Sequence, residues 1–475
     1  MKKKVLGLLL SATMVAGMLA GCGSAAETTQ QVAETAQQVA ETAEQVADTA
    51  QQAAETVAEP AADEGKVLNI CAWNEEFKSR LTDHYPGYEV VDGTTGKIGD
   101  VTVNWLITPN EENAYQNRLD ELLLAQDSAA ADEKIDLFLV EADYAVKYTD
   151  TPYTMSIFDL GLTADDIKDQ YSYTQAVVTD SNGVIKGSSW QGCPGVMIYN
   201  RNIAKEVFGS DDPADVQPLF SDWTKFVESA GKLKDAGYSV ISSTADTFRV
   251  YQNNAKLPWV NGTQIQVDDN LKKWVEDSKA LADAGYCNTW GQWGEDWNKG
   301  FYPEGKVFAY FGPAWLIDFC MAADVEGSVG YEGGWAATEG PQGFYWGGTW
   351  ICAATGTDNV SLVADIMKKM TCDPEIMKDI VLKDNDFVNN RPVMEELAND
   401  PTYQNKVLGG QNPLKMFCAG ADNIDMANLT AYDQGLLGDF QTAMGDYING
   451  NYATYDEALE QFYTLALQRY PELTR

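Results

Sequence analysis

The sequence predicts an α/β protein with a mostly parallel sheet, helices on both of its faces, and more than one folded core. Three observations carry this prediction. From residue 66 to residue 144, short apolar runs of strand length alternate with segments whose apolar residues recur at helical spacing. Helical spacing returns in several later segments. At 475 residues, the chain is also too long for a single hydrophobic core.

The N-terminus has the order of an export signal. Lysines at residues 2–4 precede an uncharged apolar run over residues 5–20, which ends in Leu19-Ala20-Gly21-Cys22. The run is shorter than the ~20 residues that a spanning helix needs. Leu-Ala-Gly-Cys resembles the lipobox of bacterial lipoproteins, in which the cysteine is lipidated and becomes the new N-terminus. We therefore expect a signal peptide over residues 1–21 and lipidation of Cys22, although an ordinary signal with a chance cysteine would share most of this pattern.

Residues 22–65 are expected to form an acidic linker. A seven-residue repeat runs from Gln30 to Val57, and its Val and Ala residues alternate four and three apart, as in a coiled coil. Such small side chains bury little apolar area, and the segment contains no Lys or Arg. A solvated, partly helical stalk is favoured over a true coiled coil.

The body begins with alternating strands and helices. Buried strands are predicted over residues 66–72 and 135–140, a strand with alternating apolar residues over 101–107, and helices over residues 77–84 and 115–123. Two longer helices follow, containing Trp223 and Trp274 on their apolar faces, and each closes at a glycine. Residues 286–350 are rich in Gly and aromatic residues. Helical spacing of apolar residues returns after residue 355, and residues 389–392 interrupt it.

Composition excludes several classes of function. A net charge of −38 disfavours nucleic acid as a partner, because phosphate backbones would be repelled. The seven cysteines after Cys22 are widely spaced and form no Cys-x-x-Cys pair, so neither a zinc site nor a disulfide framework is indicated. No cofactor-binding or metal-binding motif is present, and we expect none.

Catalysis has little support in the sequence. The single histidine, His84, lies near the end of a predicted helix, and no Gly-x-Ser-x-Gly segment is present to work with it. The sequence therefore predicts a protein that is not an enzyme. A pair of carboxylates for glycoside hydrolysis stays open, because the 71 acidic residues offer many pairs whose separation a sequence does not show.

Polar and aromatic residues follow two of the predicted strands, where ligands of open α/β sheets gather. Trp73, Asn74 and Glu75 follow the first strand, and Glu141 and Asp143 follow the third. Flat aromatic rings and carboxylate or amide groups suit the apolar faces and the hydroxyl rim of a sugar. Glu75 could equally stabilise the start of a helix, and Asp143 could equally be a solvated loop charge.

A second set of candidates comes from turns. Nine of the 13 tryptophans lie between residues 259 and 350, and several adjoin glycines that let the backbone approach a ligand. These candidates are Trp190, Trp315, Trp346 and Trp350. The alternative for each is packing beneath a loop. Arg249 and Arg391 could bind hydroxyls or a carboxylate, or could form surface ion pairs.

Taken with the lipobox and stalk, residues 66–471 resemble the substrate-binding lipoproteins of bacterial ABC sugar importers, the extracellular solute-binding protein family. Tyr199-Asn200-Arg201 is similar to the family's Tyr-Asn-Lys segment, and residues 218–226 to its Pro…Trp…Phe helix start. Residues 305–309 and Gly312-Pro313-Ala314-Trp315 resemble its Gly-Lys-x-Ala strand and Gly-Trp turn. Here the tryptophan stands one position later than in the family's usual Gly-x-Trp.

The resemblance implies a two-lobed clamp like that of periplasmic binding proteins, with a hinge. Lobe one is expected over residues 66–178 and 344–388, and lobe two over residues 179–343 and 389–475. It also implies a monomer, tethered by lipid at the outer face of the cell membrane, that hands a carbohydrate to the permease of an ABC importer. Two alternatives stay open, a surface glycoside hydrolase and a binding protein for another solute such as a peptide.

Overall fold

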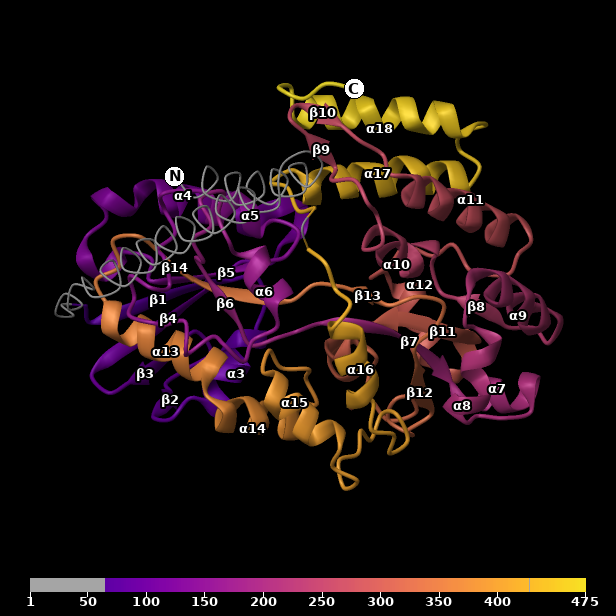
Figure 1. The fold of residues 1–475 in the computed structure, drawn as a ribbon, viewed down its shortest axis with the longest axis horizontal. Coiled ribbons are helices and arrows are strands. Elements are labelled where there is room, and N and C mark those ends of the chain that lie inside the picture. Colours follow the sequence, from indigo (N-terminus) through magenta and orange to yellow (C-terminus); the bar gives the residue numbers. More distant parts are fainter. Residues whose placement is uncertain (1–64, 427) are drawn as a thin grey trace, which may run out of the picture. The chain divides into compact units, whose positions relative to one another are not determined.

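The computed structural model describes residues 65–426 and 428–475 (Figure 1). These residues belong to one compact unit. The predicted signal peptide, Cys22 and nearly all of the predicted linker lie outside the described residues, so those three predictions stay predictions.

The first of the two main sheets has seven strands in the order β2-β3-β4-β1-β5-β14-β6. Their bounds are β1 Val67–Ala72, β2 Tyr88–Val90, β3 Thr95–Ile98, β4 Val101–Ile107, β5 Leu137–Glu141, β6 Ser188–Ser189 and β14 Thr349–Ala353. β1 pairs in parallel with β4 and with β5, as the alternating pattern predicts. The β2–β3 hairpin and strand β14 are antiparallel to their neighbours and were not predicted as parts of this sheet.

The second sheet has the order β12-β7-β11-β8, and β13 also pairs with β7. Its strands are β7 Pro194–Asn200, β8 Ser239–Ile241, β11 Val307–Gly312, β12 Trp335–Thr338 and β13 Phe344–Tyr345. A separate two-stranded ribbon joins β9 Val260–Asn261 to β10 Gln264–Ile265. We call the part built on the seven-stranded sheet the first lobe and the part built on the five-stranded sheet the second lobe.

The chain passes between the sheets at two short segments near the middle of the molecule. It leaves the first sheet after Ser189 and enters the second at Pro194, then returns between Tyr345 and Thr349. These crossings lie downstream of the boundaries expected after residues 178 and 343. Both crossings contribute residues to the cavity described below.

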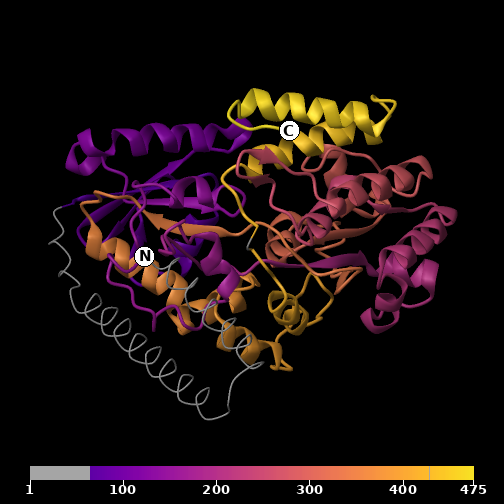
Figure 2. The ribbon, with the colours of Figure 1, turned by 45° about the horizontal axis from the view of Figure 1, so that its top comes forward.

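The α-helices cover both sheets. Their bounds are α3 Glu76–His84, α4 Ala114–Ala125, α5 Ala145–Thr149, α6 Ser172–Val177, α7 Arg201–Phe208, α8 Pro213–Val216, α9 Trp223–Asp235, α10 Phe248–Gln252, α11 Asp269–Asp283, α12 Glu295–Asn298, α13 Val360–Cys372, α14 Pro374–Asp384, α15 Arg391–Ala398, α16 Leu414–Ala421, α17 Asp433–Ile448 and α18 Tyr455–Arg469. Figures 1 and 2 show α4 and α5 on one side of the first sheet and α13 on the other. The α/β prediction, with helices on both faces, is thereby confirmed. The expectation of a mostly parallel sheet is wrong, because β1–β4 and β1–β5 are parallel whereas the other four pairings of the seven-stranded sheet are antiparallel.

The sequence signals for the two long helices of the second lobe agree with the structure. α9 and α11 end before Gly237 and Gly285, which have the left-handed φ values of 89° and 63° that glycine adopts without steric cost. The Trp274 ring is buried and lies edge-on to Phe248. Figure 2 shows α17 and α18 side by side, and α17 packs against α11 through Phe440, which contacts Trp274.

Three further properties concern the described residues only. All seven of their cysteines are free thiols. No cluster of three or more His, Cys, Asp or Glu side chains in this part is placed to hold a metal ion. None of its helices combines the length and the apolar composition needed to cross a membrane.

Candidate functional site

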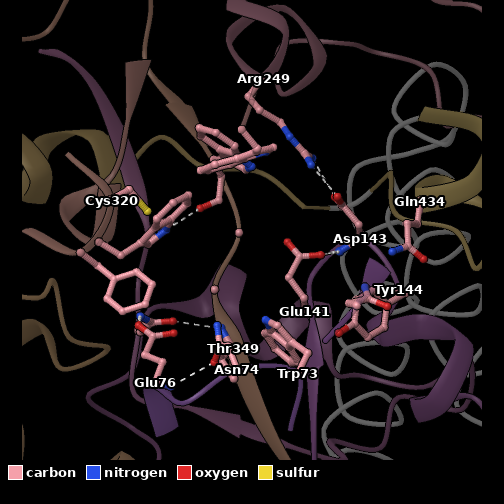
Figure 3. A pocket seen from close by; sticks show the side chains of 18 of the residues that line it. Trp73, Asn74, Glu76, Glu141, Asp143, Tyr144, Arg249, Cys320, Thr349 and Gln434 are labelled. Carbon is pink, nitrogen blue, oxygen red and sulfur yellow. Dashed lines mark hydrogen bonds and ion pairs between the residues drawn. The ribbon is translucent and has the colours of Figure 1, made fainter. Parts of the chain in front are cut away.

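A cavity of about 440 Å³ lies where the two lobes face each other, and both crossing segments reach it (Figure 3). The first lobe contributes Trp73, Asn74, Glu76, Asn110, Glu141, Asp143 and Tyr144. The crossings contribute Gln191, Trp346, Gly347, Gly348 and Thr349. The second lobe and the C-terminal helices contribute Ala245, Arg249, Gln292, Trp293, Trp315, Phe319, Cys320, Gln434 and Gln441. The lining therefore mixes aromatic rings with amides and carboxyl groups.

The first-lobe side of the cavity is built at the carboxyl ends of parallel strands. Trp73 directly follows β1, Asn110 follows β4, and Glu141 is the last residue of β5. Parallel strands end at the same edge of a sheet, so these side chains meet there although up to 68 residues separate Trp73 from Glu141.

Tryptophans form the second-lobe side. The rings of Trp315 and Trp346 are edge-to-face with centroids 5.0 Å apart, and Trp293 lies 5.5 Å from Trp346. Trp315 also donates its Nε1–H to the backbone oxygen of Trp346 at 3.3 Å. Gly347 has a φ of 74°, and a Cβ there would stand 3.3 Å from the Trp315 ring. Glycine thus allows this crossing segment to pass tightly against the indole.

An ion pair connects the two lobes at the cavity wall. Arg249 of α10 donates from Nη1 and Nη2 to the two carboxylate oxygens of Asp143, at 2.7 and 2.5 Å. Both side chains are about 15% exposed. Figure 3 shows Arg249 reaching across to Asp143, with Glu141 beside that contact. Burial of Arg249 acts to lower the pKa of its guanidinium, but the nearby Asp143 carboxylate raises that pKa above its usual value. Arg249 is therefore always charged.

Two carboxyl groups of the lining have raised pKa values. Burial raises the pKa of Glu141 to about 8; the charge of Asp143 adds to the rise, and Arg249 opposes it. Burial likewise raises the pKa of Glu76 to about 7, with Asp386 adding to the rise and Arg80 and a hydrogen bond from Gln191 opposing it. At neutral pH these groups can both donate and accept hydrogen bonds.

Two lining residues hold polar atoms without a partner. The side-chain oxygens of Asn110 and Tyr144 are buried and accept or donate no hydrogen bond among the described residues. Buried polar atoms nearly always have a hydrogen-bond partner. Two buried oxygens without one, on residues that line a cavity, therefore indicate a place where a ligand group could form hydrogen bonds.

Comparison with known proteins now places the chain. Residues 92–408 match the family model described as bacterial extracellular solute-binding protein. The chain belongs to this family. No curated protein matches its sequence.

Solved structures resemble this solute-binding protein in fold. One, described as an extracellular solute-binding protein of family 1, is 18% identical and has a TM-score of 0.66; the match covers 84% of this chain and 99% of the other. The ABC transporter associated binding protein of B. animalis subsp. lactis, in complex with beta-1,6-galactobiose, is 18% identical with a TM-score of 0.63, covering 86% and 98%. The galacto-N-biose/lacto-N-biose I-binding protein of Bifidobacterium longum, in complex with lacto-N-biose, is 12% identical with a TM-score of 0.63, covering 88% and 100%. Their shared two-lobed α/β fold is the fold of this chain.

Seven of the eleven ligand-binding candidates chosen from the sequence lie together in the cavity of this solute-binding protein. They are Trp73, Asn74, Glu141, Asp143, Arg249, Trp315 and Trp346. Their contact with a ligand stays a prediction, which the structure makes geometrically possible.

The other four candidates lie elsewhere. Trp190 is fully buried in the first lobe, stacked on Phe77. Trp350, on β14, is also buried and donates to the backbone oxygen of Thr174 at 2.8 Å. The side chain of Glu75 is 62% exposed and pairs with Lys78. Arg391 starts α15 and pairs with Asp422, with its guanidinium over the Tyr171 ring.

The packing explains these four positions. Because neighbouring residues of a strand point to opposite faces, Trp350 turns into the core while Thr349 lines the cavity. In the first crossing segment, Gln191 lines the cavity and Trp190 is buried in the core. At the start of α3, Glu76 rather than Glu75 points inward. We leave the four out of the proposed site.

Sequence reasoning missed several lining residues. Glu76 and Gln191 adjoin the chosen candidates Glu75 and Trp190. The sequence signal therefore lay one residue away from the residue that lines the cavity in both places. Trp293 lies in the tryptophan-rich region and has a left-handed φ of 70°, which a bulky residue rarely adopts, but a sequence does not show that angle. Gln434 and Gln441 come from α17, and no local pattern connects that helix with the cavity.

Proposed function

We propose that this chain is an extracellular binding protein that captures a carbohydrate, an oligosaccharide, and delivers it to the permease of an ABC importer. It acts as a monomer, tethered to the outer face of the cell membrane by lipid on Cys22 after removal of residues 1–21, and it catalyses no reaction. The cavity between the lobes carries the proposal. Its aromatic rings offer flat surfaces for sugar faces, and its amides, carboxyls and unpaired oxygens offer partners for hydroxyl groups.

The related structures support the same assignment. Two of those described above hold disaccharides, and a further one, an ABC substrate-binding protein of Listeria monocytogenes, is in complex with cycloalternan. A cavity of about 440 Å³ is within the usual range for small-molecule sites. Lobe boundaries are proposed at the sheet crossings, residues 190–193 and 346–348.

A surface glycoside hydrolase is the second candidate, because Glu76 and Glu141 are two carboxyl groups with raised pKa values in one cavity. A panel of oligosaccharides and short peptides, followed by calorimetry and chromatography, separates the candidates. Saturable binding of a glycan without products supports the proposal. Cleaved glycan supports the hydrolase, and binding confined to peptides contradicts both.

A further inference from the structure

Acidic groups outnumber basic groups in the lining of the cavity. Its acidic residues are Glu76, Glu141 and Asp143, and Arg249 is the one cationic residue among the described residues that line it. Both terminal nitrogens of Arg249 are already bonded to the carboxylate of Asp143. The guanidinium therefore compensates Asp143 and has little left to offer the other two acids.

The Glu141 carboxyl accepts one hydrogen bond among the described residues. Its Oε2 accepts the backbone N–H of Asp143 at 2.8 Å, while its Oε1 has no hydrogen-bond partner among the described residues. No Lys or His lines the cavity in this part of the chain, and Arg249 binds Asp143 instead. An ionised Glu141 would have no ion-pair partner of its own, which burial makes costly.

Glu76 has a similar setting on the opposite side of the first-lobe wall. Its Oε1 accepts a hydrogen bond from Gln191 Nε2 at 2.7 Å. The nearby Arg80 is paired with Asp384 at 3.0 Å and with Asp386 at 3.8 Å. That guanidinium is therefore shared between two other carboxylates.

The surroundings of Glu141 also suit a cation in other ways. Tyr144 is 3% exposed and lines the cavity, and its hydroxyl oxygen has no partner among the described residues, so it is available to accept an N–H. The ring of Trp73 lines the same wall, and Trp293, Trp315 and Trp346 line the facing one. Aromatic faces attract ammonium groups when water is excluded.

Resting on the function proposed above, we propose that the carbohydrate ligand carries a protonated amine, as an amino sugar does, and that its ammonium group pairs with Glu141. The ammonium donates one N–H to Oε1 of Glu141 and another to the hydroxyl of Tyr144. The sugar rings lie against the tryptophans of the second lobe. A neutral sugar hydroxyl could bond to the same atoms, with Glu141 staying protonated, but it would form no ion pair there.

Binding of an amine changes the protonation of Glu141. Burial raises the pKa of Glu141, so the empty cavity holds this carboxyl protonated near neutral pH. When the ammonium group enters, Glu141 releases its proton to the solvent and the carboxylate accepts an N–H of the ligand. Binding of an amino sugar therefore releases a proton, whereas binding of a neutral sugar does not.

The test uses the protein produced from its full chain and three disaccharides that share one ring type and linkage. They are cellobiose, chitobiose and fully deacetylated chitobiose, which carry a hydroxyl, an N-acetyl group and an amine at the same carbon. Calorimetry at low salt is expected to show the deacetylated form binding about tenfold more tightly than either neutral form. Glu141→Gln should remove that preference. Glu75→Gln, an exposed neighbouring site outside the cavity, is the matched control and should retain it.

Each outcome has a distinct meaning. The amine assignment is overturned if the deacetylated form does not bind, if it binds no more tightly than the neutral forms, or if its preference persists in Glu141→Gln. If neutral glycans still bind in that case, the carbohydrate function stands. Putrescine, a diamine without a sugar ring, is the last probe. If it binds as tightly as the deacetylated disaccharide, the site recognises the ammonium group alone, and the proposed carbohydrate function fails instead.

Discussion

Arg249 of the second lobe and Asp143 of the first lobe form a two-pronged ion pair, with N–O distances of 2.7 and 2.5 Å, at the wall of the cavity between the lobes. The pair joins residues 106 positions apart in the sequence. It connects the two halves of the protein directly, and it occupies the one cationic side chain that lines the cavity in the described residues.

Removing one partner of this pair should cost more than removing both. Asp143→Asn leaves Arg249 mostly buried without its carboxylate, and we expect unfolding by denaturant to show a loss of about 3 kcal/mol. The double variant Asp143→Asn/Arg249→Gln should recover part of that loss. The exposed pair of Lys272 and Asp269 is the control, since Asp269→Asn should change stability by less than about 1 kcal/mol. Equal losses of stability for Asp143→Asn and Asp269→Asn would contradict a contribution from the interlobe pair.

Trp315 and Trp350 should separate binding from stability. Trp315 lines the cavity, and Trp315→Ala should weaken glycan binding about ten- to a hundredfold while the melting temperature of the ligand-free protein changes little. Trp350 is 1% exposed, and Trp350→Ala should cost about 3–5 kcal/mol of stability because it empties core volume. Calorimetric binding and thermal melts measured on both variants check this. Intact affinity in Trp315→Ala would place that ring in the core instead.

Glu141 should make the protein less stable as the pH rises. Its pKa is about 8 in the folded state and near the ordinary 4.5 in the unfolded state, so between those values the folded state holds a proton that the unfolded state has lost. Stability therefore declines across pH 4.5–8 and levels off above. Glu141→Gln should flatten this decline and raise the free energy of unfolding above pH 8. A variant with the same pH profile as the parent would show that another group is responsible.

Ligand binding should close the lobes. The two sheets are joined by short crossings, and rotation about such segments is the usual way in which binding proteins enclose a ligand. Small-angle X-ray scattering should show a smaller radius of gyration at saturation with the glycan identified in the panel. An unchanged scattering profile at saturation counts against a hinged clamp.

The lipid anchor rests on the sequence alone. Cys22→Ser should release the protein from the membrane or leave its precursor uncleaved, because the apolar run before it is too short to span the bilayer. Detergent partitioning and fractionation provide the measurement. A variant that still partitions with the detergent phase would remove the lipoprotein assignment.

Much of the fold could be predicted because its signals are local. The apolar runs at residues 66–72 and 135–140 correspond to β1 and β5, since a strand buried on both faces is largely apolar. The alternation at residues 101–107 corresponds to β4, in which Val103 and Trp105 are buried. The Asp-Ala-Gly-Tyr ends of α9 and α11 mark helix termini because the chain needs a left-handed residue there. The β2–β3 hairpin was missed because its strands are short and largely exposed, so they carry little alternation.

The candidate site shows where local signals end. From the sequence alone came the α/β class, the prediction of an export signal with its cysteine, and the placement of Trp73, Glu141 and Asp143 at strand ends, because strand ends and apolar periods are properties of neighbouring residues. Tertiary structure alone decided which of two neighbouring residues faces the cavity, and so put Gln191 there and Trp190 in the core. It alone also paired Arg249 with Asp143 and left Glu141 without an ion-pair partner of its own, because both depend on contacts between lobes that no local pattern records.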